Sequence, residues 1–155
     1  MNEADPAYAK VMAYIDHHPA AVLGTVDEDT QPHGAVVYVC TASHGAVCFV
    51  TKNLTKKYGN LAAHPQVSLT FYDEKESSTL QVAGKAFIAD DPDMINYVMD
   101  KVAKLHSLQS DWLPPVSKVQ AGEYAVVGVE LTHARLAEFR GMGIGSDGIF
   151  TQISA

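Results

Sequence analysis

A cluster of lysine and threonine residues is the part of the sequence best suited to chemistry. Three of the nine lysines, Lys52, Lys56 and Lys57, fall within six residues, with Thr51 and Thr55 among them. The cluster spans the end of an expected strand and the first turn of an expected helix, where the helix dipole disfavours a positive side chain. A bound anion would reverse that penalty. Backbone N–H groups, two hydroxyls and two or three ammonium groups would together form a phosphate site.

The same cluster also has a simpler interpretation. Charged runs usually form solvated faces, and three lysines at the start of a surface helix need no ligand. The residues alone leave both interpretations open.

Hydrophobic periodicity predicts the elements that position this cluster. Apolar residues at helical spacing predict helices over 6–17, over 53–64 and from residue 92 onward. Apolar and β-branched runs between polar turns predict strands over 20–26, 34–41, 46–51, 66–72, 79–88, 123–131 and 133–139. Residues 107–122 are expected to be irregular, and the glycine-rich tail 141–155 to carry a short strand near its end. Closely spaced strands with few helices between them indicate a closed or nearly closed antiparallel barrel.

Local signals support these boundaries. Asp5 before Pro6 and Asp91 before Pro92 are typical helix starts, because aspartate caps the first turn and proline suits the first helical position. Gly84 inside a strand predicts a bulge or a close approach of another backbone.

Composition bounds the function. The chain has 155 residues, suited to a single domain over 1–155, with a helix to residue 18, a barrel over 20–140 and a tail over 141–155. A hydrophobic share of 47% excludes a disordered chain. The net charge of −7 disfavours nucleic acid as a partner. The apolar run 35–40 is too short to span a membrane, and no signal peptide is visible, so we expect a cytoplasmic protein.

Six short segments follow one another in a recognisable order: LGTV at 23–26, QPHG at 31–34, FVTK at 49–52, KKYGNL at 56–61, HPQV at 64–67 and VAGKA at 82–86. In this order they resemble the FMN-binding split-barrel family, around pyridoxamine 5′-phosphate oxidase and the general stress protein 26-type proteins. The resemblance implies a mainly β (α+β) fold: an antiparallel six- or seven-stranded split β-barrel with flanking helices. It also implies a homodimer with cofactor sites at the subunit interface.

The resemblance assigns roles to the residues it covers. It implies that the phosphate of FMN is held by Thr51, Thr55, Lys56 and Lys57, with Lys52 adding charge. The edge of the isoalloxazine ring would lie on the backbone of Val36, Val37 and Tyr38. A polar side chain on the strand before Gly84 would contact the ring, either Thr79 or Gln81.

Departures from the family limit what is carried over. The oxidase has a basic residue at each end of its second strand, where this chain has Ala35 and Cys40. Its arginine-bearing substrate motif is not recognisable over 135–140. The expected function is therefore an FMN-dependent oxidoreductase of an unassigned small-molecule redox substrate, with no catalytic residue named. The alternatives are a non-catalytic flavin- or haem-binding sensor or carrier, and a deazaflavin-dependent reductase.

Other motifs are interpreted as structural. The G-x-G-x-x-G match over 143–148 lacks the following helix that a dinucleotide site requires. Cys40 and Cys48 are expected to be buried small hydrophobes. The seven histidines show no metal-binding spacing, although one could serve as a haem ligand. Trp112 could pack under a loop or flank a flavin ring.

Overall fold

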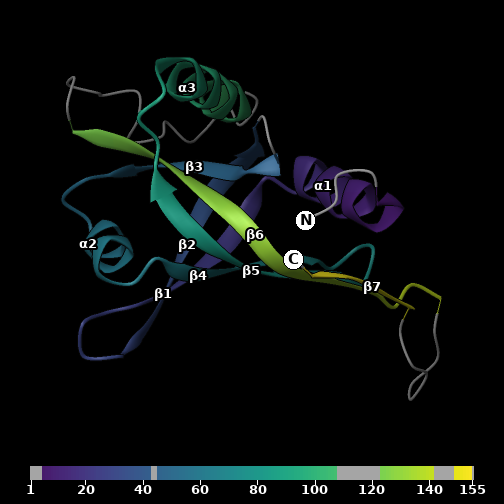
Figure 1. Cartoon of the computed structure of the whole chain (residues 1–155). Coiled ribbons are helices and arrows are strands. Elements are labelled where there is room, and N and C mark those ends of the chain that lie inside the picture. Colours follow the sequence, from purple (N-terminus) through teal and green to yellow (C-terminus); the bar gives the residue numbers. More distant parts are fainter. Residues whose placement is uncertain (1–4, 43–44, 108–122, 142–148, 155) are drawn as a thin grey trace.

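A computed structural model describes residues 5–42, 45–107, 123–141 and 149–154, which contain seven strands and three helices (Figure 1). In chain order these are α1 (Pro6–His17), β1 (Ala20–Val26), β2 (Pro32–Thr41), β3 (Val47–Lys52), α2 (Lys56–Ala63), β4 (Gln66–Asp73), β5 (Ser78–Ile88), α3 (Pro92–Ser107), β6 (Tyr124–Glu138) and β7 (Ile149–Ser154). No helix among these residues is long and apolar enough to cross a membrane.

Six of the strands close into an antiparallel barrel. The sheet order is β3-β2-β1-β4-β5-β6-β7, and an additional pairing of β3 with β6 closes the ring. Strand β7 pairs with β6 outside the closure, as Figure 1 shows. The predicted antiparallel barrel of six or seven strands is confirmed.

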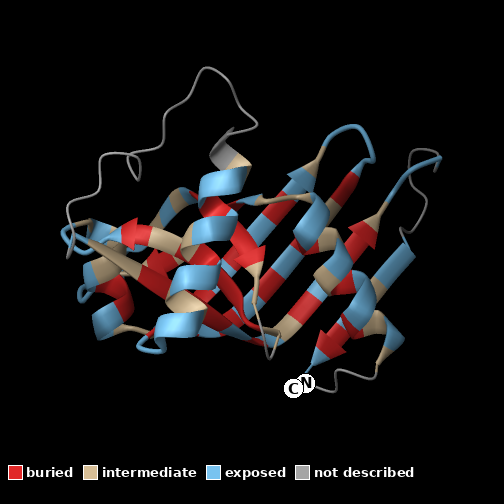
Figure 2. Cartoon of the chain, turned by 90° about the horizontal axis from the view of Figure 1, so that it is seen from above, coloured by how far each residue is buried: buried red, intermediate tan, exposed pale blue. Residues whose placement is uncertain are grey.

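The core fills the barrel because alternate strand residues point inward. Figure 2 shows the resulting bands of buried and exposed residues along several of the strands. Leu23, Leu69 and Leu80 are fully buried inside, and α1 adds Val11 and Ile15 to the same cluster. A second apolar cluster lies between β2, β3 and β6 and the buried face of α3.

The helix starts are largely as predicted. Asp5 Oδ1 accepts a 2.9 Å hydrogen bond from the Ala7 N–H, and Asp91 Oδ1 accepts one of 3.2 Å from Asp93. Helix α2, however, begins at Lys56 and not at residue 53. Residue 53 instead extends the ladder between β3 and β6, because its N–H donates to the Glu123 carbonyl at 3.0 Å.

Strand β6 was predicted as two strands and is one. The pairing of β5 with β6 shifts register at Gly84: Ala83 faces His133 and Gly84 faces Leu131. Thr132 between them bulges, and its Oγ1 donates to the Ala83 carbonyl at 3.1 Å. A Cβ on Gly84 would lie 2.5 Å from the Glu130 carbonyl oxygen, which confirms the predicted close approach.

The predicted final strand in the tail is present as β7. Trp112 and the 143–148 glycine motif lie outside the described residues.

Candidate functional site

Two hydroxyls meet where β3 passes into α2. Thr51 Oγ1 is buried and lies 3.1 Å from Thr55 Oγ1, and Thr55 Oγ1 donates to the Lys52 carbonyl at 2.8 Å. Thr55 is the N-cap residue of α2, but its side chain makes no capping hydrogen bond. The first N–H groups of a helix have no partner within the helix. The N-terminus of α2 is therefore chemically suited to an acceptor from outside the chain.

The three lysines lie in the chain at or just before this helix start. Lys56 and Lys57 are the first two residues of α2, and Lys52 ends β3 with its Nζ 5.6 Å from the centre of the Tyr124 ring. Thr51, Lys52, Thr55, Lys56 and Lys57 therefore lie along one short stretch, from the end of β3 to the first turn of α2. Ammonium groups and the free N–H groups of a helix start are donors suited to a phosphate monoester. The Thr55 hydroxyl would have to turn away from the Lys52 carbonyl to donate to the same ligand.

A buried hydrogen bond holds α2 against β1. Asn60 Nδ2 donates to Thr25 Oγ1 at 3.0 Å, and both residues are almost fully buried. Sequence reasoning missed this contact. The available signals were a polar residue one turn after Lys56 and a threonine at an inward position of β1.

A carboxylate also lies beside one of the lysines. Asp27, in the turn after β1, lies with its Oδ2 3.4 Å from Lys56 Nζ and 3.0 Å from His33 Nε2. The hydrogen bond from His33, followed by that from the Gln31 backbone, lowers the pKa of Asp27 to about 2. The sequence predicted a polar turn here but no link to Lys56.

The predicted ring-binding strand has one edge turned away from β1. The Val39 N–H donates to the Pro19 carbonyl of the chain leading into β1. In an antiparallel pair, the backbone groups of alternate residues point toward the partner strand. The N–H and C=O of Val37 therefore point toward β1, and those of Val36 and Tyr38 point away from it. Strand β3 pairs with β2 only over residues 39–41. Val36 therefore presents its backbone groups at an edge that no described strand pairs.

This edge borders the lysine cluster. Extending the pairing of Val39 with Phe49 would put Val37 level with Thr51 and Val36 level with Lys52. There β3 leaves β2 and pairs with β6 alone, Thr51 facing Ala125. The predicted phosphate residues and the predicted ring-binding backbone lie along the two strands where they diverge.

Thr79 and Gln81 lie elsewhere. Both are on the outer face of β5, and Gln81 faces Thr70, which in turn faces Val22 of β1. The stretch from Val22 to Asp27 spans about 16 Å along the strand, and β5 lies two strand spacings, about 10 Å, from β1. One chain therefore does not bring Thr79 or Gln81 to the lysines.

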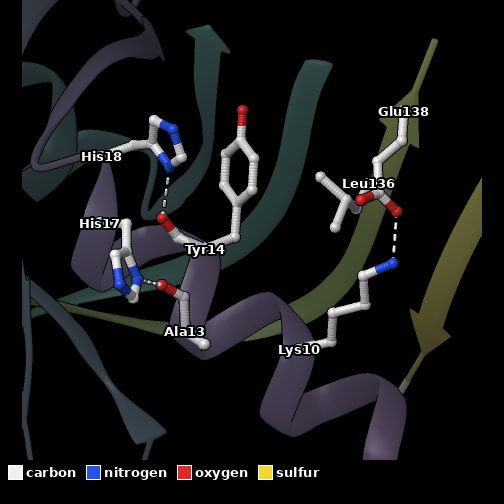
Figure 3. Close-up of a pocket in the computed structure, with 7 residues that line it drawn as sticks. All are labelled: Lys10, Ala13, Tyr14, His17, His18, Leu136 and Glu138. Atoms are coloured by element: carbon white, nitrogen blue, oxygen red, sulfur yellow. Dashed lines mark hydrogen bonds and ion pairs between the residues drawn. The ribbon is translucent and has the colours of Figure 1, made fainter. Parts of the chain in front are cut away.

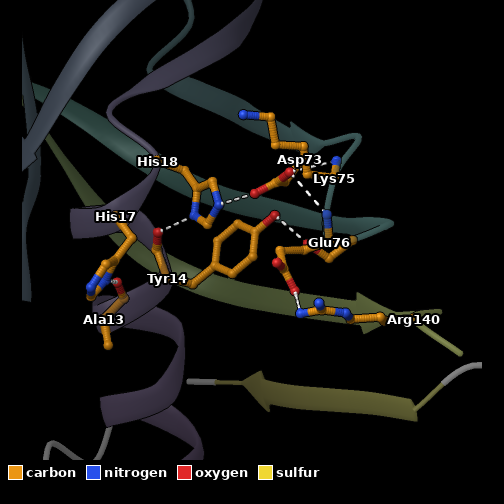
Figure 4. A network of polar contacts seen from close by, with 9 residues as sticks. Ala13, Tyr14, His17, His18, Asp73, Lys75, Glu76 and Arg140 are labelled. Carbon is orange, nitrogen blue, oxygen red and sulfur yellow. Dashed lines mark hydrogen bonds and ion pairs between the residues drawn. The ribbon is translucent and has the colours of Figure 1, made fainter.

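A separate hollow of about 230 Å³ lies between α1 and β6 (Figure 3). Its polar side chains pair with one another or with nearby groups: Lys10 with Glu138, and the Tyr14 hydroxyl with Ser78 at 2.9 Å. Nε2 of His18 lies 2.7 Å from Asp73, and its Nδ1 lies 2.7 Å from the Tyr14 carbonyl (Figure 4). These contacts join α1 to the barrel and involve none of the predicted site residues.

Cys40 and Cys48 face each other across β2 and β3 and are buried, as predicted. Burial raises the pKa of Cys40 to about 11 and that of Cys48 to about 12. Among the residues that the structure describes, no group of three His, Cys, Asp or Glu side chains could hold a metal ion.

Comparisons with solved structures agree with this fold. A pyridoxamine 5′-phosphate oxidase-related, FMN-binding protein from Nostoc punctiforme is 13% identical, with a TM-score of 0.65 over 100% of this chain and 99% of that one. General Stress Protein 26 from Bacillus anthracis is 18% identical, with a TM-score of 0.61 over 93% and 97%. A haem-binding protein from Mycobacterium smegmatis is 15% identical, with a TM-score of 0.70 over 99% of this chain and 60% of that one.

At these identities the likeness concerns the fold. A comparison with curated proteins gave no significant match. The family model for pyridoxamine 5′-phosphate oxidase, by contrast, matches residues 8–136, which is most of the chain. The chain belongs to the pyridoxamine 5′-phosphate oxidase family.

Proposed function

We propose that this protein binds FMN and uses it for oxidation–reduction of a small molecule. The observation that carries the proposal is the uncapped start of α2, with Thr51, Thr55 and three lysines in the stretch that leads into it. An acidic chain has few cations, and three of its nine lysines are gathered here. A dianionic phosphate would compensate their repulsion from the helix dipole.

The neighbouring edge of β2 supports a flavin over a bare phosphate. A flavin ring carries hydrogen-bond donors and acceptors along one edge, and a strand edge offers both in alternation. The backbone of Val36, level with Lys52 by register, provides such an edge beside the proposed phosphate position. Tyr38 directs its backbone to the same side.

The separation of Thr79 and Gln81 from the lysines supports a homodimer. If these two side chains contact the ring, they must come from a second copy of the chain. The outer face of the barrel carries Val22, Val36 and Tyr72, which are 47%, 67% and 68% exposed. Exposed apolar side chains gathered on one sheet face favour a surface that a two-fold partner covers.

The flavin would supply the electron or hydride transfer, and the protein its binding, orientation and shielding from water. No side chain near α2 is assigned as a catalytic acid or base. A protein that holds its cofactor without turnover is thus a second candidate, and the fold shared with a haem-binding protein extends this candidate to haem.

The visible spectrum of the native protein tests the proposal. Bands of oxidised flavin, with FMN released on denaturation, would support it. A Soret band would replace FMN with haem, and release of a deazaflavin would change the cofactor class. Bleaching by NAD(P)H followed by recovery with an oxidised substrate would distinguish an oxidoreductase from a carrier.

A further inference from the structure

The turn between β1 and β2 directs a carboxylate at the proposed phosphate site. Asp27 Oδ2 lies 3.4 Å from Lys56 Nζ, while the Lys56 side chain itself is 62% exposed. Lys56 is the first residue of α2 and is among the groups proposed to hold the phosphate. One of the three cations therefore already faces an anion of the same chain.

This carboxylate is held firmly in position. Its Oδ1 accepts hydrogen bonds from the backbone N–H groups of Gln31 at 2.8 Å and Asp29 at 3.1 Å. Its Oδ2 faces His33 Nε2 at 3.0 Å. These hydrogen bonds, that from His33 first, lower the pKa of Asp27 to about 2, so the carboxylate is charged near neutral pH. Lys56 is the member of the pair that has room to reorient, because its long side chain is mostly exposed.

We propose that Asp27 is a built-in counter-ion for Lys56 that competes with the cofactor phosphate and limits how tightly the site holds FMN. The inference rests on the proposed function. In the empty site Asp27 compensates the charge of Lys56 beside the helix start. When phosphate arrives, Lys56 must leave Asp27 or lie between two anions that repel each other.

The direction of the effect follows from the charges. When two anions share one ammonium group, their nearest oxygens lie about 5–6 Å apart. At the dielectric constant of a partly exposed site, we expect their repulsion to outweigh the benefit of a fixed lysine. Removing the charge of Asp27 should therefore strengthen FMN binding. A neutral flavin should not respond.

Titration of flavin fluorescence at low ionic strength tests this with wild-type protein, Asp27→Asn and Asp29→Asn. Asparagine keeps an oxygen for the two backbone N–H groups. Asp29 is exposed in the same turn, so Asp29→Asn changes the net charge equally without touching Lys56. We expect Asp27→Asn to bind FMN roughly three to ten times more tightly and Asp29→Asn less than twofold. Riboflavin affinity should be unchanged in both.

Two further measurements test whether the gain in FMN affinity comes from the charge of Asp27 and its pairing with Lys56. The gain from Asp27→Asn should shrink in high salt, and it should be smaller in a Lys56→Gln background, where no pair is broken. If Asp27→Asn disturbs folding, Asp27→Ser offers a hydroxyl to the turn and is expected to act in the same direction.

The inference would be overturned if Asp27→Asn and Asp29→Asn bound FMN with equal affinity. It would also be overturned if Asp27→Asn bound FMN more weakly than the wild type, since that would mean that Asp27 only positions Lys56. Failure of the proposed function has a different signature. In that case wild-type protein would bind FMN no better than riboflavin.

Discussion

The Asn60 side chain of α2 donates a buried 3.0 Å hydrogen bond to Thr25 Oγ1 of β1. Asn60 lies one turn after Lys56, and Asp27 lies two residues after Thr25, so the two contacts fasten α2 along the end of β1. This attachment sets the direction in which the start of α2 points, and it therefore also sets the geometry of the proposed phosphate site.

Asn60→Ala should lower the free energy of unfolding by about 1–3 kcal/mol, because it leaves the buried Thr25 hydroxyl without its donor. Urea unfolding measures the change. The double variant Asn60→Leu with Thr25→Val should recover part of the loss, since neither polar group then remains. If the loss of unfolding free energy in the double variant equalled the sum of the losses in Asn60→Leu and Thr25→Val alone, the hydrogen bond would not be what couples the two residues.

Two glycine substitutions should act in opposite directions. Gly84→Ala places a Cβ 2.5 Å from the Glu130 carbonyl oxygen and should destabilise the barrel. Gly59→Ala lies in α2 with nothing within 4 Å of the added Cβ, and should stabilise by about 0.5–1 kcal/mol. Thermal unfolding of both variants tests this pair. A Gly84→Ala protein as stable as the wild type would contradict the close approach of β5 and β6.

The contact between His18 and Asp73 should make stability depend on acid pH. The His18 hydrogen bond lowers the pKa of Asp73 below its ordinary value. A carboxyl whose folded pKa is lowered stabilises the protein above its unfolded pKa, about 3.9, and this contribution disappears as the pH falls through the folded value. Asp73→Asn should lose less stability than the wild type between pH 5 and acid conditions. The neighbouring exposed Glu74→Gln is the control, and identical pH profiles for wild type and Asp73→Asn would refute the assignment.

The cysteines should be unreactive in the folded protein. Their raised pKa values, about 11 for Cys40 and about 12 for Cys48, keep both as thiols near neutral pH. A thiol reagent at pH 8 should modify them only after unfolding, because the thiolate is the reactive form. Above the unfolded pKa of about 8.5 the folded state should lose stability as the pH rises. Rapid modification of native protein at pH 8 would contradict the burial of this pair.

Local patterns were sufficient for most of the fold. The alternation over 66–72 predicted β4, and Asp5 before Pro6 predicted the start of α1, because both depend on neighbouring residues. The start of α2 was misplaced since residue 53 bonds to Glu123, far away in the sequence. The two predicted strands of β6 are continuous because Thr132 bulges against Ala83, which only the register of β5 reveals.

The residues of the candidate site likewise fall into those that the sequence could predict and those that only the fold reveals. The lysine cluster is contiguous in sequence and was found there. Asp27 contacts Lys56, and Asn60 joins α2 to Thr25, through tertiary contacts that sequence spacing does not reveal. Thr79 and Gln81 share a face of β5, as the period of a strand predicts, but their distance from the lysines emerged only from strand order.

The central claim is that a phosphate binds at the start of α2, and FMN titration of the double variant Lys56→Ala with Lys57→Ala tests it most directly. The matched control removes two exposed lysines elsewhere, Lys75→Ala with Lys101→Ala. We expect the first variant to lose about 2–4 kcal/mol of FMN binding free energy, through the loss of two charge-assisted contacts, and the control to bind as the wild type does. Riboflavin, without a phosphate, should bind all three proteins alike. An FMN affinity of the Lys56 and Lys57 variant equal to that of the control would contradict the account.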